Sequence, residues 1–326
     1  MTRVGAIDCG TNSIRLLIAD VDNDSAGSAG SNGSAGSGRL TDLLRRMEIV
    51  RLGHGVDKTG VIAPDAMART LAQAREYAAQ CSELGVQRVR FVATSASRDA
   101  RNAQEFVDGV RDAFAAFGVT PDVVTGHQEA ALSFQGATGD LRAKGIPGPY
   151  LMVDLGGGST EFVRGTDDVE QARSVDVGCV RITERHLRSD PPTSGEIAAA
   201  VRDIEAAIDQ AAELVGFRGI STLVGLAGSI TTITAHALRL TTYDPEQIHL
   251  SRLPSAQVIE ACTSLLSMTR AQRAALPFMH SGRVDVIGAG ALVWGTIVQR
   301  MERDAGITEV VTSEHDILDG IALSIA

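Results

Sequence analysis

The stretch VDLGGGSTEF, residues 153–162, places two carboxylates and two hydroxyls around three successive glycines. Glycine can adopt positive φ and lets a ligand approach closely, so backbone N–H groups can gather around an anion such as phosphate. The carboxylates of Asp154 and Glu161 would repel that anion unless a hard cation lay between them, and Mg²⁺ is the usual one. Taken alone, the stretch fits equally well a β-hairpin whose glycine-rich turn carries incidental polar residues.

A second copy of the pattern lies near the N-terminus, in VGAIDCGTNSIRLLI, residues 4–18. Four pairs of residues match at one constant offset and without a gap: Asp8 with Asp154, Gly10 with Gly156, Ser13 with Ser159, and Arg15 with Glu161. Both copies continue as chain with a β pattern. The sequence therefore predicts two related strand–turn–strand units, one in each half. Two such turns facing each other would hold a phosphate between them.

The length and composition are typical of a globular protein with two domains. The 326 residues exceed one ordinary core, and 44% are hydrophobic while 21% are charged. No apolar run reaches the roughly 18 residues that a membrane span requires. The N-terminus leads straight into a strand that Asp8 interrupts. We therefore expect no signal peptide, no membrane partner and a cytoplasmic location.

The cysteines and the net charge argue against a zinc protein and against a general nucleic-acid-binding protein. The four cysteines are scattered, without a CxxC pair or a Cys/His cluster, and predict reduced thiols and no zinc site. The net charge of −10 argues against general binding of nucleic acid. A polyanionic substrate would then need local cations, for which Arg98 and Arg101 are candidates. The arginines of residues 39–51 are explained as well by a solvated strand face.

Strands and helices alternate along most of the chain, which predicts the α/β class. Residues 88–94, RVRFVAT, read as a buried strand before a helix, and residues 122–134, DVVTGHQEAALSF, read as strand, turn and helix. Residues 25–38, SAGSAGSNGSAGSG, are of low complexity and predict a flexible, enlarged hairpin loop.

Five motifs, in the order TSASRDA, GHQEAAL, DLGGGSTE, GLAGSITTI and DVIGAGA, resemble those of the exopolyphosphatase / guanosine pentaphosphate phosphatase family. The two glycine-containing turns resemble the phosphate-binding loops of the superfamily of actin, sugar kinases and heat-shock chaperone ATPases. The resemblance covers nearly the whole chain. It implies an α/β fold of two ribonuclease-H-like (actin-like) domains with the active site in the cleft between them. We expect these domains at residues 1–125 and 126–312, with a helix in residues 313–326 packing back on the first.

The same resemblance implies hydrolysis of the terminal phosphate of inorganic polyphosphate, of guanosine pentaphosphate, or of both. It places the catalytic carboxylate on Glu129, because position 128 is Gln. The implied metal ligands are Asp154, Glu161 and Asp8, although Asp8 fits equally well as a structural acceptor in its own turn. The implied phosphate-binding residues are Asn12, Ser13, Arg98, Gly156, Gly157, Gly158, Ser159 and Thr160. Family analogy adds Mn²⁺ as an alternative to Mg²⁺, stimulation by K⁺, and a homodimer.

These residues support a mechanism for phosphoryl transfer to water. A Mg²⁺ ion on Asp154 and Glu161 would bridge phosphate oxygens, while the turn and Arg98 take up the remaining charge. Glu129 would position and deprotonate the water. A glutamate at a helix start also favours the helix dipole without any catalytic role. His127 is left out, because a lone histidine in a turn is more often structural.

Two other classes of function use similar loops. A kinase of the sugar-kinase type would need ATP, a base aimed at a substrate hydroxyl, and an adenosine pocket around GLAGS, residues 225–229. The chain has no recognisable sugar-binding segment, which argues against this reading. A non-enzymatic sensor of a phosphate-rich alarmone would keep the turns but tolerate the loss of Glu129, which is present.

Overall fold

The computed structural model describes residues 1–22 and 39–325, and the chain divides into two compact units. Unit 1 consists of Met1–Gly139 and Ile317–Ala326, and unit 2 of Asp140–Asp316. The sequence placed the boundary between residues 125 and 126, at the start of helix α5 (Gly126–Ala143), whereas the division of the structure falls inside that helix. The predicted Gly/Ser loop, residues 25–38, lies outside the described residues.

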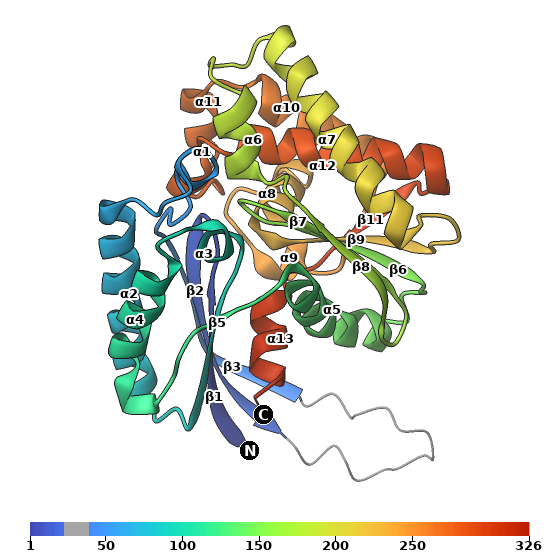
Figure 1. The fold of residues 1–326 in the computed structure, drawn as a ribbon. Helices are drawn as coiled ribbons and strands as arrows, with labels where there is room; N and C mark the ends of the chain where they lie inside the picture. Colours follow the sequence, from blue (N-terminus) through green and yellow to red (C-terminus); the bar gives the residue numbers. More distant parts are fainter. Residues whose placement is uncertain (23–38, 326) are drawn as a thin grey trace. The chain divides into compact units, whose positions relative to one another are not determined.

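Unit 1 is built on a five-stranded sheet with the strand order β3-β2-β1-β4-β5. β1, β2 and β3 pair antiparallel, and β4 and β5 continue the sheet in parallel from β1. The strands are β1 (Thr2–Cys9), β2 (Ser13–Asp22), β3 (Arg39–Ile49), β4 (Arg88–Ala93) and β5 (Asp122–Val123). Almost every residue of β1 is buried, because helices cover both faces of the sheet (Figure 1).

The two faces of this sheet carry different helices. α2 (Pro64–Glu83) and α4 (Ala103–Ala113) lie along one face, and α13 (Ile317–Leu323) lies against the other (Figure 1). α13 is anchored by Asp319, which is 2% exposed and pairs with Arg45 of β3 at 2.5 Å. The C-terminal segment is therefore part of unit 1, although it follows unit 2 in the chain.

Unit 2 is built on a six-stranded sheet with the order β10-β11-β9-β6-β7-β8. Its strands are β6 (Tyr150–Leu155), β7 (Thr160–Gly165), β8 (Val169–Val175), β9 (Thr222–Leu226), β10 (Ser251–Pro254) and β11 (Glu309–Thr312). Apart from the edge strand β10, the order β8-β7-β6-β9-β11 repeats the order and the strand directions of unit 1. The two related halves that the motifs predict are present, and the α/β fold class is confirmed.

Unit 2 has its own core, formed where helices pack on one face of the sheet. Its longer helices are α6 (Cys179–His186), α7 (Ser194–Val215), α8 (Ala227–Ala237), α10 (Ser255–Ser267) and α12 (Ile287–Ala305). The shorter helices of the chain are α1 (Val56–Thr59), α3 (Ser95–Asp99), α9 (Pro245–Ile248) and α11 (Arg270–Ala274), with 3₁₀ turns at Ala115–Phe117 and Ser281–Arg283. α12 packs closely, because a Cβ on Gly290 would lie 2.8 Å from the Ser229 hydroxyl.

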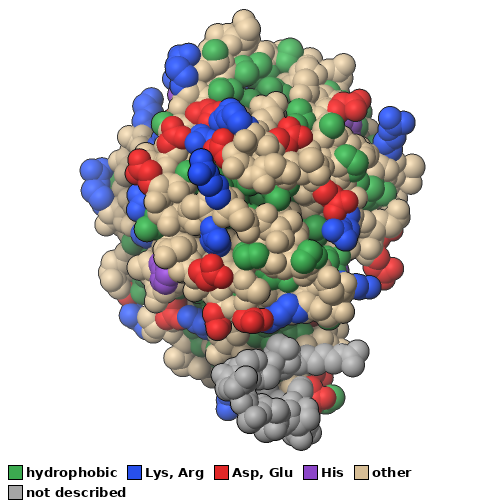
Figure 2. All heavy atoms as spheres, turned by 90° about the vertical axis from the view of Figure 1, so that its right-hand side faces the viewer, with side chains coloured by type: hydrophobic (Ala, Val, Ile, Leu, Met, Phe, Trp, Pro, Cys, Tyr) green, Lys and Arg blue, Asp and Glu red, His purple; other side chains and the backbone are tan. Residues whose placement is uncertain are grey.

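Charged side chains of both signs share the surface (Figure 2), and the thiols are buried. On the face that Figure 2 shows, acidic and basic side chains are interspersed rather than gathered into separate blocks. All four cysteines are buried and free, and burial raises the pKa of Cys81 to about 12. Among the helices described, none combines the length and the apolar character needed to cross a membrane.

Candidate active site

The two predicted turns have the same backbone geometry. In unit 1 the N–H of Gly10 donates to the carbonyl of Ser13 at 2.9 Å, and in unit 2 the N–H of Gly156 donates to the carbonyl of Ser159 at 3.0 Å. Each bond closes the turn between the first two strands of its sheet. The constant offset between the two sequence motifs therefore corresponds to a repeated structure.

The acidic residues of unit 2 lie in one row across the sheet. Asp154 on β6 is directly opposite Glu161 on β7, and Glu161 is opposite Ser174 on β8. Directly opposed residues project from the same face of an antiparallel pair. Asp154 is 7% exposed and Glu161 is 1% exposed, and the Ser174 hydroxyl donates to Glu161 Oε1 at 2.7 Å. Buried carboxylates side by side form a set of oxygen donors that suits a hard divalent cation.

The corresponding row of unit 1 has a different chemistry. Asp8 on β1 is directly opposite Arg15 on β2, and the Arg15 guanidinium donates to Asp8 Oδ2 from Nη2 at 2.8 Å and from Nε at 3.0 Å. Arg15 supplies one positive charge where unit 2 has Glu161. A role of Asp8 as a metal ligand stays a prediction, and a metal there would have to compete with this ion pair.

The carbonyl oxygens of the glycine turn in unit 2 are held by α6. The N–H of Cys179 donates to Gly156 and that of Val180 to Gly157, at 3.0 and 2.9 Å. Arg181 Nε donates to the Gly158 carbonyl at 2.7 Å. These donors engage the turn oxygens that would otherwise repel an anion. Arg181 was missed from the sequence, because it lies on α6, beyond β8, and belongs to none of the motifs.

Close packing, and not a left-handed backbone, accounts for Gly156 of this turn. We expected positive φ to be their use, but Gly156, Gly157 and Gly158 are absent from the glycines of positive φ in the described chain. A Cβ on Gly156 would lie 3.1 Å from the Ser159 carbonyl oxygen. A Cβ on Gly178, just before α6, would lie 2.4 Å from the Gly157 carbonyl oxygen.

The two hydroxyls of the turn differ in their bonding. Thr160 is fully buried, and its hydroxyl donates to the Val177 carbonyl at 2.6 Å. Its single proton is thus used within the protein, which argues against Thr160 as a donor to phosphate. The Ser159 hydroxyl has no hydrogen-bond partner within residues 1–22 and 39–325. Its predicted contact with phosphate stays a prediction.

Glu129 and Arg98, which were predicted for separate roles, form an ion pair in unit 1. Arg98 Nη1 lies 3.3 Å from Glu129 Oε2 and also donates to the Val124 carbonyl at 2.9 Å. Glu129 is 8% exposed and lies in the first turn of α5. Thr125 caps this helix, since its hydroxyl accepts from the Gln128 N–H, and Gln128 Oε1 accepts from the Thr125 N–H in return. Gln128 therefore has a structural role and carries no carboxylate. Glu129 is the carboxylate of the motif.

Asn12 and Ser13 lie in the turn between β1 and β2. The Asn12 carbonyl accepts hydrogen bonds from the N–H groups of Val50 and Arg51, at 3.1 and 2.9 Å, and Ser13 begins β2. These contacts fix the position of the backbone. That the side chains of Asn12 and Ser13 contact phosphate stays a prediction. The predicted residues are divided between the units: Asp8, Asn12, Ser13, Arg98 and Glu129 belong to unit 1, and Asp154 to Glu161 belong to unit 2. That both groups act on one phosphoryl group also stays a prediction.

Comparisons with known proteins give a consistent result. A family model described as the Ppx/GppA phosphatase family matches residues 32–325. The chain is 50% identical over 328 residues to Exopolyphosphatase 2 of Mycobacterium tuberculosis, an alignment that covers 100% of this chain and 99% of that protein. It is 27% identical over 284 residues to a guanosine-5'-triphosphate,3'-diphosphate pyrophosphatase of Photobacterium profundum, covering 87% of this chain and 50% of that protein.

Solved structures agree with these relatives. The crystal structure of an exopolyphosphatase-like protein superimposes with a TM-score of 0.90 at 41% sequence identity, covering 99% of this chain and 98% of that one. The Aquifex aeolicus PPX-GPPA enzyme superimposes with a TM-score of 0.77 at 29% identity, covering 99% of each chain.

Proposed function

The chain belongs to the Ppx/GppA phosphatase family, and from this we propose that it is an exopolyphosphatase, which hydrolyses the terminal phosphate of inorganic polyphosphate. The identity of 50% over the whole chain to a protein named Exopolyphosphatase 2 supports polyphosphate as the substrate. The structural observation that carries the chemistry is the direct opposition of Asp154 and Glu161 beside a glycine turn.

Asp154 and Glu161 would hold the catalytic metal, Mg²⁺ or alternatively Mn²⁺. The donor set fits, because both carboxylates are buried and opposed in register on one sheet, and hard divalent cations prefer such oxygens. When bound, the ion neutralises and orients the phosphate oxygens. Stimulation by K⁺ and a homodimeric state are further proposals, supported by family analogy alone.

The other residues of the chain would bind the phosphate and activate the water. The N–H groups of the turn and the Ser159 hydroxyl would donate to phosphate oxygens, and Arg98 would neutralise part of their charge. Glu129 would orient the attacking water and accept its proton as the new P–O bond forms. The bond from the terminal phosphorus to the bridging oxygen would break in the same step, and the shortened polyphosphate would leave with that oxygen. The ion pair with Arg98 supports this role, since it holds the Glu129 carboxylate in one position.

Guanosine pentaphosphate is a second candidate substrate of the same site. Its support is the similarity to a relative that is named for a guanosine triphosphate-diphosphate substrate. Both substrates end in a phosphoanhydride, so the same water, metal and turn would serve for each.

The test is the release of inorganic phosphate by the purified protein from short polyphosphate, ATP and guanosine pentaphosphate, with Mg²⁺ and with excess chelator. We expect release from polyphosphate that requires the metal. Release from guanosine pentaphosphate alone would assign the second substrate. Consumption of ATP that depends on an added sugar would indicate the kinase, and tight binding without any release would indicate the sensor.

A further inference from the structure

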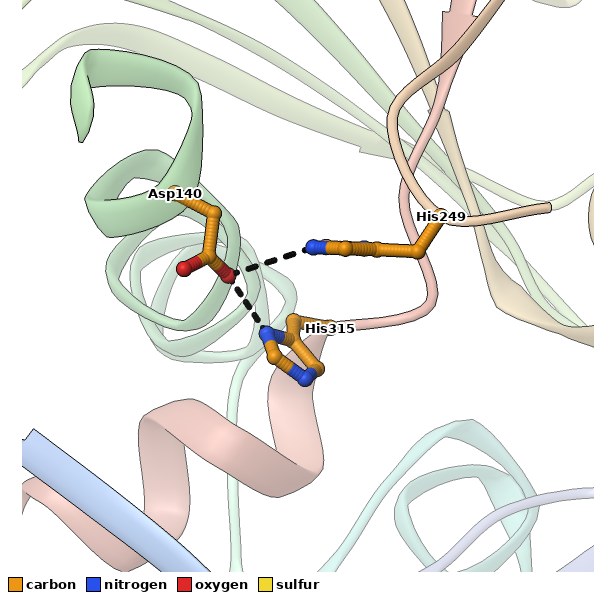
Figure 3. A group of neighbouring side chains, drawn as sticks. All are labelled: Asp140, His249 and His315. Carbon is orange, nitrogen blue, oxygen red and sulfur yellow. Dashed lines mark hydrogen bonds and ion pairs between the residues drawn. The ribbon is translucent and has the colours of Figure 1, made fainter. Parts of the chain in front are cut away.

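Asp140, His249 and His315 form a cluster that the proposed reaction does not use (Figure 3). Asp140 lies near the end of α5, His249 follows α9, and His315 lies between β11 and α13. Asp140 Oδ2 lies 2.5 Å from His315 Nδ1 and 3.5 Å from His249 Nε2. One ligand atom from each residue lies within 4.8 Å of the other two. All three residues belong to unit 2.

We propose that this cluster binds one divalent transition cation of the zinc class. Two imidazoles and one carboxylate are a donor set of zinc and its neighbours, whereas Mg²⁺ and Ca²⁺ prefer oxygen ligands alone. Tetrahedral zinc with bonds of about 2.0–2.1 Å places its ligand atoms about 3.3 Å apart. The distances of 2.5 and 3.5 Å from Asp140 Oδ2 lie on either side of that separation, so small side-chain movements admit the ion.

The cluster is accessible to an ion from solution. The side chains of Asp140, His249 and His315 are 41%, 23% and 39% exposed. Partial exposure also leaves a fourth coordination position for water.

Binding requires the hydrogen bonds of the cluster to be exchanged for metal bonds, because His249 Nε2 and His315 Nδ1 each donate a ring proton to Asp140 when no ion is bound. On coordination through Nδ1, the ring proton of His315 moves to its Nε2. The N–H of Glu314 donates to His249 Nδ1 at 3.2 Å, so Nε2 carries the ring proton and faces Asp140. Coordination through Nε2 moves the proton to Nδ1 and ends the bond with Glu314. Three metal–ligand bonds then replace this contact and the two imidazole–carboxylate hydrogen bonds, each of ordinary strength. Without the cation the three residues form a hydrogen-bonded network, and with it they form a metal site.

The position of the cluster in the chain indicates what the ion would do. Asp140 is the first residue of unit 2, and His315 directly precedes its last residue, Asp316. The ion would therefore fasten together, within unit 2, the two segments at which the chain passes between the units. The scattered cysteines predicted no zinc site, but these ligands come from positions too far apart in the sequence to form a recognisable motif.

The test measures binding of Zn²⁺, in the presence of excess Mg²⁺, to the full chain carrying Asp154→Asn. This substitution weakens the separate catalytic metal site. Calorimetry and the thermal unfolding midpoint are recorded for this background and for the same background with His249→Ala, His315→Ala or Asp140→Asn. His186→Ala is the matched control, since it removes another histidine of unit 2 that pairs with a carboxylate, Asp203 at 3.0 Å. Co²⁺ bound to the unsubstituted chain gives a visible absorption band if its site is tetrahedral.

We expect one equivalent of Zn²⁺ to bind to the background and to the His186→Ala control, and to raise the midpoint of both. Mutation of a residue that only hydrogen-bonds a metal ligand weakens metal binding by about 10- to 100-fold. Each cluster substitution removes a ligand itself, so it should weaken Zn²⁺ binding by at least as much. Equal affinity in the cluster variants and the control would overturn the site, as would no binding to the background. If an alanine variant fails to fold, Asp140→Asn and the Co²⁺ band still test whether the cluster binds the ion. Absence of the band would overturn the tetrahedral site. None of these readouts depends on phosphatase activity.

Discussion

Asp154 and Glu161 face each other on β6 and β7 at the register position that Asp8 and Arg15 occupy on β1 and β2. One row therefore presents two acids and the other an acid with its own cation. Across a sheet, opposite charges in directly opposed positions stabilise and like charges destabilise. The difference at a single position, Arg15 against Glu161, separates a row that is neutralised internally from a row suited to bind a cation.

Glu161→Arg should convert the row of unit 2 into that of unit 1. The new arginine would pair with Asp154 as Arg15 pairs with Asp8, so metal-dependent phosphate release should fall by at least about 10²-fold. Glu161→Gln, which removes charge without adding a cation, should instead raise the Mg²⁺ concentration for half-maximal activity. Circular dichroism checks that both variants fold. Full activity of folded Glu161→Arg would exclude Glu161 as a metal ligand.

Arg98 and Glu129 should show coupled effects, because they form one ion pair. Glu129→Gln should slow hydrolysis by about 10²–10⁴-fold, the range for loss of a general base. We expect the double variant with Arg98→Ala to be non-additive. The free-energy change obtained from its kcat/KM should differ by about 0.5–3 kcal/mol from the sum of the two single changes. Arg111→Ala is the control, since Arg111 is half-exposed, pairs with Asp108 within α4, and should leave activity near that of the unsubstituted chain. Strict additivity would argue that the pair does not act as a unit.

Arg181→Met should weaken substrate binding through the glycine turn. The change keeps an apolar stem but leaves the Gly158 carbonyl without its 2.7 Å partner. A buried polar group that loses its partner costs about 1–3 kcal/mol, so KM for polyphosphate should rise by roughly 5- to 150-fold. The Mg²⁺ requirement should not change, and Arg181→Lys should restore part of the loss. Arg185→Met on the same helix, where Arg185 pairs with Asp203, is the control.

Glu196 should make folding stability depend on pH under acid conditions. It accepts hydrogen bonds from the N–H groups of Thr193, Ser189 and Arg188, and these bonds lower its pKa from 4.5 to about 2. Because the folded state binds its proton more weakly, Glu196 stabilises the fold fully above pH 4.5, and the contribution is lost as pH falls towards about 2. Denaturant unfolding of Glu196→Gln should show a flatter pH dependence in this window. An unchanged slope would mean that other carboxylates dominate.

Much of the fold and part of the candidate site could be predicted from the sequence. The motifs at residues 4–18 and 153–162 predicted two equivalent strand–turn–strand units, and both units have the same turn bond and the same strand order. This succeeded because a hairpin is a local structure. A few adjacent residues set its turn, and the alternation of side chains sets which residues oppose each other. The opposition of Asp154 and Glu161 follows from that register.

Only the tertiary structure decided which distant residues complete these local units. It placed the Arg181 guanidinium on the Gly158 carbonyl, paired Arg98 with Glu129, and brought His249 and His315 to Asp140. It also engaged the Thr160 hydroxyl within the protein and located the division between the units inside α5. Contacts of this kind depend on how helices and loops pack on a sheet, and that packing is the sum of many weak interactions between segments far apart in the chain. No local pattern of residues encodes such a sum.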